Sequence, residues 1–553
     1  MMKKFFCIFF LTLAALVSAS GQSHLSERVY VSTDKDVYVS GDDMFFSAFC
    51  LDASKDVLSG ASAIAYMEIC SPDGPVQTAK VALSKGRGSG YITIKNTIPT
   101  GNYRLVAYTA QCFNEEGYDF ESGSKVISII NPFTTDRSQS GVEILSDDEY
   151  ASLSQPAPAQ SGSVSASVSG QALTVTNNSD KPLTLSVSIS HNDGIVPPSD
   201  SSPVSFRKSM KAGTSFAPVR ELEFEGEVIR AKVIPRDEED LPKFAGVEAL
   251  LSVPGEGTDL YTSTIGEDGS AVFYTRNIYG DVEAITEVLY EDLESHLDLE
   301  SPFKGVNAGG LEPLKLSRSL EDEILQRSTS MQIQKAMSAD SLYERLPVPE
   351  DLLFGDDALE YILDDYTRFP LMEELFIEFI SPARVRRTDN GRAIYLVLQD
   401  TFKPGAYEQI LPVMTLLDGV PVTDHESILN YDPLLVEKII VYPHTYCFGH
   451  WSFGGVINFI TYKRNLPSYE FGHNTRAVDF QGASIPVASY LPVGSADVPD
   501  MRETILWHPQ LEIGPGERRV LNFALPSYDG EFDVVVEGFD SEGAPQYYKT
   551  ALQ

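Results

Sequence analysis

Three apolar blocks within residues 413–463 constrain the fold of this chain more than any other feature. They read VMTLLDGVPVTD, VEKIIVY and FGGVINFITYK. Each block has the length of a strand, and Gly419, Gly454 and Gly455 stand where strands meet turns. Asp418 can hydrogen-bond the amides of its turn, and Gly419 suits a backbone with positive φ. These blocks predict a compact unit of closely packed strands.

The order and spacing of the blocks resemble the plug domain of TonB-dependent outer-membrane receptors. Residues 454–461 match the family pattern G-G-V-I-N-I-x-T, whereas Ile440 stands where the family usually has Glu. The resemblance implies that a set of structural residues holds the domain together without binding ligand: Asp418, Gly419, Gly454, Gly455 and Asn458. A barrel that encloses a plug has about 22 strands. Only 553 − 463 = 90 residues follow here, so we expect a plug without its barrel.

The first 20 residues have the pattern of a signal peptide. Lys3 and Lys4 precede an apolar run over residues 5–17, and small residues follow for cleavage. The remaining sequence has no run of about 18 apolar residues, so we expect no transmembrane segment in the mature chain. The predicted location is the periplasm or the outer membrane, with the cell surface as a further option.

The net charge limits the classes of partner that we expect, and the cysteine content limits the disulfides. The chain has 79 acidic and 42 basic residues, a net charge of −37, which argues against binding nucleic acid or anionic lipid. Four cysteines follow the signal peptide: Cys50, Cys70, Cys112 and Cys447. Export permits disulfides, but so few cysteines do not form a disulfide scaffold, and we expect mostly buried free thiols.

Alternating apolar runs and turn signals predict a mainly β, multi-domain chain. Its parts are tandem β-sandwiches, a helical spacer, an α+β plug-like domain and a C-terminal β unit. The predicted boundaries are a signal peptide 1–20, a macroglobulin-like sandwich 27–133, a linker 134–165, a small sandwich 166–217, a carboxypeptidase-regulatory-like sandwich 222–302, the helical spacer 317–346, the plug-like domain 351–465 and the C-terminal β-domain 501–550.

The first sandwich carries two motifs that resemble macroglobulin domains. TDKDVYVSGD at 33–42 is similar to the entry strand of that family, and GNYRLVAYT at 101–109 is similar to a late strand. We interpret Tyr38 and Tyr103 as core or corner aromatics, and Gly41 as a turn residue. The Gly-Cys-Gly-Glu-Gln thioester of macroglobulin protease inhibitors does not occur in the sequence, which argues against a protease trap.

Finer predictions concern the second half of the chain. The spacer is predicted to be helical with Ser319 as its N-cap. Within the plug-like domain we predict an amphipathic helix over 356–369 and a strand over 375–380. Residues 466–500 contain Pro, Gly and Ser and are predicted to be irregular.

One metal-like cluster occurs, His444-x-x-Cys447-x-x-His450. Zinc sites need a fourth ligand, for which Asp424 or His425 is a candidate, and the alternative is a loop without metal. We expect no metal, no cofactor and no catalytic group, because no nucleophile, phosphate-loop or metallohydrolase motif is present. Asp340-Ser341-Leu342 fits a short O-glycosylation pattern of Gram-negative envelopes.

Three functional hypotheses follow from the sequence. The first is a non-catalytic binding or scaffold protein of the Gram-negative envelope, with envelope proteins as partners and an outer-membrane β-barrel as one option. An extended peptide added to a sandwich edge is a suitable mode of binding. The second is an accessory subunit of a separate TonB-dependent transporter for glycan or peptide. The third is a metal-dependent hydrolase that uses His444, Cys447 and His450.

Overall fold

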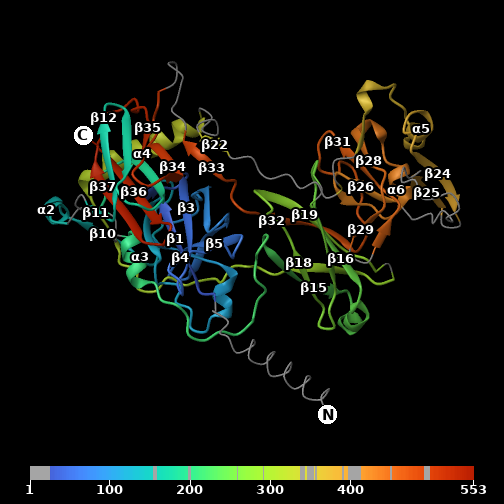
Figure 1. Ribbon diagram of the computed structural model, residues 1–553, viewed down its shortest axis with the longest axis horizontal. Helices are drawn as coiled ribbons and strands as arrows, with labels where there is room; N and C mark the ends of the chain where they lie inside the picture. Colours follow the sequence, from blue (N-terminus) through green and yellow to red (C-terminus); the bar gives the residue numbers. More distant parts are fainter. Residues whose placement is uncertain are drawn as a thin grey trace, which may run out of the picture. The chain divides into compact units, whose positions relative to one another are not determined.

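The computed structural model describes residues 25–153, 159–196, 201–257, 259–290, 292–336, 343–345, 354, 358–388, 391–396, 413–448, 451–490 and 499–552. The fold is mainly β, as predicted, and it divides into two compact units (Figure 1). Unit 1 takes residues 1–227, 302–347 and 483–553, and unit 2 takes 228–301 and 348–482. The chain therefore leaves unit 1 and returns to it twice. None of the described helices is long and apolar enough to span a membrane.

The first sandwich of unit 1 lies within the predicted 27–133 module. Its elements are β1 Glu27–Thr33, β2 Val37–Val39, β3 Asp43–Asp52, β4 Val57–Leu58, β5 Ile64–Ser71, β6 Gly74–Ala82, β7 Arg87–Thr93, β8 Gly101–Tyr108, η1 Ala110–Asn114 and β9 Lys125–Ile130. One sheet has the order β1-β3-β4 with β7 also on β3, and the other is β2-β9-β8-β5-β6. Tyr38 is fully buried in the core between them. Tyr103 is also buried, and its hydroxyl donates to the carbonyl oxygen of Pro99 at 2.6 Å, which fixes a corner of the sandwich.

The second sandwich of unit 1 combines two stretches that the sequence analysis treats as separate, 166–217 and 501–550. Its strands are β11 Ala159–Ser161, β12 Val164–Ser169, β13 Ala172–Asn177, β14 Leu183–His191, β34 Thr504–Ile513, β35 Arg518–Asn522, β36 Phe532–Asp540 and β37 Pro545–Ala551. The sheets are β11-β37-β36-β14-β34 and β12-β13-β35. A few strands from either stretch alone would leave apolar faces open, and together they enclose one core.

Several short elements of unit 1 lie in the predicted linker and spacer. They are β10 Val142–Leu145, α2 Asp147–Ala151, α3 Pro203–Ser209, β21 Leu314–Ser317, η3 Arg318–Leu320, α4 Glu321–Ala336, β22 Tyr343–Arg345 and β33 Val487–Tyr490. β10 pairs in parallel with β21, so the stretch 134–165 is partly ordered into the fold. Within the predicted helical spacer 317–346, residues 321–336 form α4, whereas residues 343–345 form strand β22, and Ser317, not Ser319, caps the turn before α4.

Unit 2 begins with a third sandwich. Its elements are β15 Val228–Pro235, η2 Glu238–Phe244, β16 Glu248–Val253, β17 Asp259–Thr264, β18 Ser270–Tyr274, β19 Asp281–Val288, β20 Ser295–Leu299 and β32 Thr475–Gln481. The sheets are β18-β15-β20 and β17-β16-β19-β32. β32 falls in the stretch predicted to be irregular, yet it pairs antiparallel with β19 over seven residue pairs from Asp281 to Glu287.

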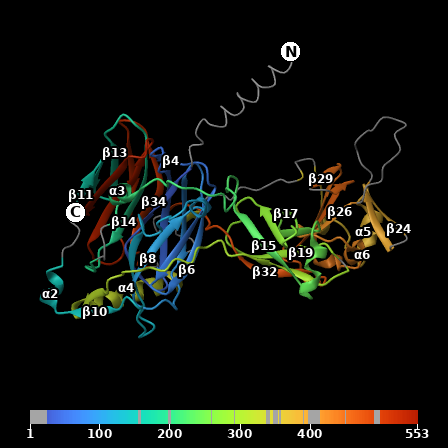
Figure 2. The same cartoon turned by 90° about the horizontal axis from the view of Figure 1, so that it is seen from below.

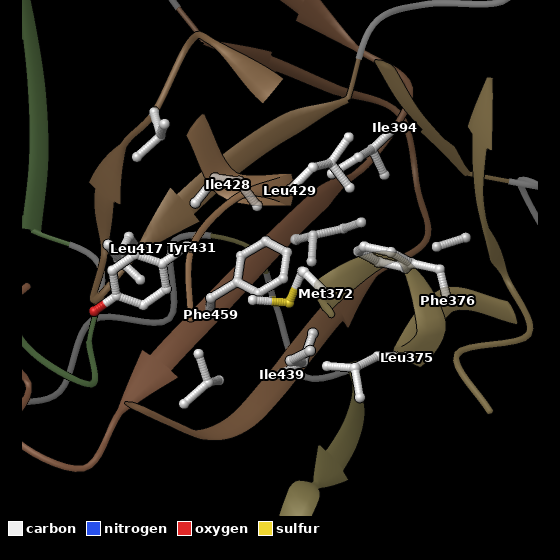
Figure 3. Close-up of a cluster of buried hydrophobic side chains, with 14 of the residues drawn as sticks. Met372, Leu375, Phe376, Ile394, Leu417, Ile428, Leu429, Tyr431, Ile439 and Phe459 are labelled. Atoms are coloured by element: carbon white, nitrogen blue, oxygen red, sulfur yellow. The ribbon is translucent and has the colours of Figure 1, made fainter. Parts of the chain in front are cut away.

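The α+β domain of unit 2 contains the three apolar blocks. Its elements are β23 Leu359–Ile362, η5 Leu363–Asp365, α5 Met372–Glu378, β24 Ala383–Thr388, β25 Gly391–Leu396, β26 Met414–Leu417, β27 Val420–Pro421, α6 His425–Leu429, η6 Pro433–Leu435, β28 Val436–Tyr442, β29 Tyr446–Phe448, β30 Trp451–Phe453 and β31 Val456–Thr461. The sheet has the order β23-β28-β31-β26-β27, with β26 parallel to β31. Figure 3 shows Met372 and Phe376 of α5 packing with Phe459 of β31 in its core.

The local predictions around residue 370 are wrong for a physical reason. Residues 359–362 form strand β23 where a helix was predicted, because they pair with the central part of the sheet through β28. Residues 372–378 form helix α5 where a strand was predicted over 375–380. Met372, Leu375 and Phe376 are buried at i, i+3 and i+4, which is the helical period.

Candidate functional site

The five structural residues of the plug-like motif all lie at the sheet of the α+β domain. Asp418 is fully buried at φ 49° and follows β26. Its Oδ1 accepts from the Thr461 amide at 2.6 Å, and its Oδ2 accepts from the Thr461 hydroxyl at 2.7 Å and the Leu466 amide at 2.8 Å. The Gly419 amide donates to Oδ1 of Asn458 at 3.1 Å. The motif thus ties the β26–β27 turn to β31.

Two of the glycines occupy backbone that a side chain would strain. Gly419 has φ 81°, and a Cβ there would approach the carbonyl oxygen of Gly257 to 2.7 Å. Gly455 has φ 126°, and a Cβ there would collide with Leu396. Gly454 is buried beside it. All five side chains and backbones are engaged in packing or hydrogen bonding of the domain, and they form no open site.

The predicted metal cluster is incompletely described. Cys447 is exposed, with its Sγ 3.5 Å from the Ser452 hydroxyl, and His450 lies outside the described residues. His425 is engaged elsewhere, since its Nδ1 accepts from the Ile394 amide at 3.0 Å and its Nε2 lies 3.1 Å from the Val413 carbonyl oxygen. Asp424 caps α6. In the described part of the chain no group of three or more His, Cys, Asp or Glu is suited to a metal ion.

The remaining sequence predictions on side chains are mixed. Cys50, Cys70 and Cys112 are buried free thiols, as expected. Burial raises the pKa of all three, to about 12 for Cys70, so they are poor nucleophiles. Ser341 lies outside the described residues.

The structure assembles a different site in unit 1, a buried charge cluster centred on Arg327. We use this name for Arg327, Asp42, His191, Asp193 and Glu503. β14 ends at His191, and its antiparallel partner β34 begins at Thr504, so the register places His191 opposite Glu503. The His191 amide donates to the Glu503 carbonyl oxygen at 2.8 Å. α4 then brings Arg327 across the ends of these strands.

Arg327 is only 3% exposed, and its guanidinium contacts several segments of unit 1. It forms an ion pair with Asp193, donates to the Val37 carbonyl oxygen at 2.8 Å, and lies 3.5 Å from Oδ2 of Asp42. Its Nε is 3.9 Å from Oε2 of Glu503. Burial lowers the pKa of Arg327, but the surrounding carboxylates outweigh it and raise that pKa. The charge therefore persists in the interior.

His191 sits between two carboxylates. Its Nδ1 is 2.9 Å from Oε2 of Glu503, and its Nε2 is 3.6 Å from Oε1 of Glu323. Burial lowers the pKa of His191, but the hydrogen bond and charge of Glu503 outweigh it and leave the pKa raised. Burial raises the pKa of Glu503, yet His191 and Arg327 bring it below its usual value. Each group of the pair therefore favours the charged form of the other.

The TDKDVYVSGD motif supplies the first sandwich's side of the cluster. Asp34 is 1% exposed and accepts from the Tyr38 hydroxyl at 2.8 Å and from the Phe45 amide at 3.2 Å. It also accepts from the Thr504 hydroxyl, which belongs to the second sandwich. Lys35 pairs with Asp34 at 3.2 Å and lies 3.9 Å from Asp42. The motif thus joins the two sandwiches as well as shaping a strand.

A cleft of about 560 Å³ opens beside the cluster, lined by His191, Asp193, Glu323 and residues of β36 and β37. The other ring nitrogen of His191 faces Glu323. The arrangement is a clamp that holds α4 and two sandwiches together.

Sequence reasoning missed Arg327, His191 and Glu503. One signal was available in the sequence. Counted from Ile324 as position i, Arg327 lies at i+3 and Met331 at i+7, so the three residues share one stripe of the helix. A lone Arg on an apolar stripe indicates a buried ion pair. Its partners are 134 to 290 residues away along the chain, so no local pattern identifies them.

Comparison with known proteins gives weak matches. No protein-family model and no curated protein matches the chain. Among solved structures it is similar to trypsin-activated α2-macroglobulin from Escherichia coli, at 8% identity, and to Salmonella α2-macroglobulin reacted with methylamine, at 9% identity, each with a TM-score of 0.16. The alignments cover 96% of this chain but only 24% and 23% of those proteins. The chain thus spans about a quarter of their length, and likeness at this level carries no conclusion about function.

Proposed function

We propose that this chain is a non-catalytic binding and scaffold protein of the Gram-negative envelope, exported to the periplasm or the outer membrane. The buried charge cluster holds two sandwiches and α4 as a frame. An open sheet edge of that frame receives an extended segment of a partner protein.

The observation that carries this proposal is the exposed end strand β35. The three-stranded sheet runs β12-β13-β35, so no strand of the described residues lies beside the outer edge of β35. Unpaired N–H and C=O groups along an edge are a template for an added strand. Val520 is 56% exposed, and Arg518 and Arg519 are exposed beside it. The arginines oppose pairing of two identical edges and favour a partner strand with acidic side chains.

A photo-crosslinking side chain at Val520 tests this interaction in intact envelopes. We expect one defined adduct from position 520. The matched control is position 234, where Ile234 is 41% exposed on β15, the central strand of its sheet. The same adducts from both positions, or none from 520, would rule out strand addition at β35. A β-barrel protein in the adduct would narrow the function to an accessory subunit of a transporter.

Metal analysis distinguishes the hydrolase hypothesis from the proposed non-catalytic function. We expect purified protein to contain no stoichiometric zinc, and chelation to leave its thermal unfolding unchanged. Stoichiometric zinc that is lost in a Cys447→Ser variant would instead favour the site at His444, Cys447 and His450.

A further inference from the structure

The α+β domain of unit 2 has an unusual cationic surface. Arg384, Arg386 and Arg387 of β24 are all exposed, in a chain whose acidic residues outnumber its basic ones by 79 to 42. None of the three forms an ion pair with another described residue. Arg384 donates to the carbonyl oxygens of Ser381 and Ala383, both at 2.6 Å, and the Arg386 guanidinium lies 5.8 Å from the Tyr395 ring. Strand alternation places Arg384 and Arg386 on one face of β24, which we call the arginine face.

Arg392, in the same β24–β25 hairpin, differs from these arginines because its guanidinium contacts acidic side chains. Its guanidinium is 2.6 Å from Oε2 of Glu426, 3.0 Å from Oε2 of Glu373 and 2.9 Å from Oδ1 of Asn430. The arginine face lacks such partners within the described residues, so its charge is available to a second molecule.

Beside the arginine face lies a surface that is apolar and acidic, which we call the α5 face. Its apolar side chains are Tyr366, Leu371 and Ile377, at 42%, 59% and 73% exposure. Tyr366 stacks on Phe379 at 4.2 Å, which holds its ring in place. Exposed apolar groups gathered in one place mark interaction sites.

Two carboxylates adjacent in sequence to these apolar side chains complete the α5 face. Asp365 precedes Tyr366 and Glu378 follows Ile377, and both are exposed and form no ion pair within the described residues. The α5 face therefore offers negative charge where the arginine face offers positive charge.

The two faces are neighbours. α5 ends at Glu378 and β24 begins at Ala383, and the two elements are in contact. Figures 1 and 2 both show α5 and β24 close together in the gold part of the chain. A positive stripe next to a negative, apolar one is self-complementary under a two-fold rotation, because residue i can contact j while j contacts i.

We propose that this surface binds a second copy of the chain and forms a closed two-fold dimer. The arginine face of each copy docks on the α5 face of the other. Burial of Tyr366, Leu371 and Ile377 supplies affinity, and the reciprocal ion pairs set the register. Because only three exposed apolar side chains are buried in each half of the contact, we expect a weak dimer that depends on concentration.

Sedimentation velocity of the full mature chain over a concentration series tests the dimer. We expect R384E/R386E and D365K/E378K each to weaken self-association at least tenfold. An equimolar mixture of the two variants restores a dimer, because both of its reciprocal contacts again join opposite charges. A misfolded variant would not be rescued by mixing, so rescue separates loss of contact from loss of fold.

The control K208E/K211E changes the net charge by the same amount as R384E/R386E at exposed lysines of unit 1, and it should leave self-association unchanged. Wild-type protein that stays monomeric at all concentrations would overturn the proposal. So would a mixture that stays monomeric, or open-ended oligomers in place of a dimer. The crosslink at Val520 is independent of all these results, so this proposal and the proposed function can fail separately.

Discussion

Asp418 in unit 2 and Arg327 in unit 1 are both buried charges, but they are satisfied in opposite ways. Asp418 accepts three hydrogen bonds from uncharged donors that all lie within residues 461–466. Arg327 is surrounded by carboxylates and a carbonyl from distant segments. The first charge shapes one domain, whereas the second decides which segments assemble with one another.

This difference affects stability, because every charged group in a buried ion network carries a desolvation penalty. Such a network adds little net stability, but removing one member leaves the others unpaired. We therefore expect unit 1 to be more sensitive than unit 2 to the loss of its central charge.

Arg327→Met should have the largest effect of the changes compared here. It leaves Asp193 buried without its cation and removes one of the two cations near Asp42 and near Glu503, which costs about 3–5 kcal/mol. In a Trp451→Phe background, Trp507 of β34 is the remaining tryptophan and reports unfolding of unit 1 in urea. Arg519→Met, which removes an exposed ion pair with Glu517 in the same unit, should cost less than about 1 kcal/mol. Equal costs would contradict the role given to the cluster.

Asp418→Asn should destabilise unit 2 by about 2–3 kcal/mol, because an amide places a donor where three donors already point. Trp451 reports this transition in a Trp507→Phe background. Asp424→Asn is the control, since Asn caps a helix as well as Asp does, and it should change little. If Asp418→Asn lowers the free energy of unfolding more than Arg327→Met does, unit 2 and not unit 1 is the more sensitive to loss of its buried charge.

Gly455→Ala should cost about 1–2 kcal/mol, because alanine is strained at φ 126° and its Cβ collides with Leu396. Gly472→Ala is the matched control, with no atom nearer than 3.9 Å to its Cβ. The same urea titration measures both. No loss at Gly455 would show that β31 can shift without cost to the sheet.

His191→Gln should give the smallest effect, on the order of 1 kcal/mol, and one that depends on pH. The pKa of folded His191 is raised from 6.5, so its contribution is complete below pH 6.5 and is lost as pH rises through the folded value. The pKa of Glu503 is lowered from 4.5, so its contribution is present above pH 4.5 and is lost at lower pH. The difference between variant and wild type should thus be largest between pH 4.5 and 6.5. A difference that grows toward pH 9 would contradict this assignment.

Sequence patterns predict those side-chain contacts whose partners lie in the same part of the sequence. The glycines, Asp418 and Asn458 belong to one short stretch, and the structure places them together at one sheet. The helix and strand around residue 370 were exchanged because pairing with β28 outweighs the local apolar pattern.

Long-range pairing explains the rest of what the sequence could not show. β14 pairs with β34 and β36, and Ser186 stands opposite Glu537 more than 300 residues along the chain. Nothing in the spacing of either stretch specifies the other. The same holds for Arg327, whose stripe on α4 indicates burial but not its partners.

The position of β14 between two C-terminal strands has a consequence for biogenesis. During synthesis, β14 emerges long before β34 and β36, so both of its hydrogen-bonding edges stay unpaired until the residues of unit 2 have been made. We expect the late strands to act as a completion check: a chain clipped or stalled before residue 504 would expose an apolar strand to chaperones and proteases, while a full-length chain would bury it.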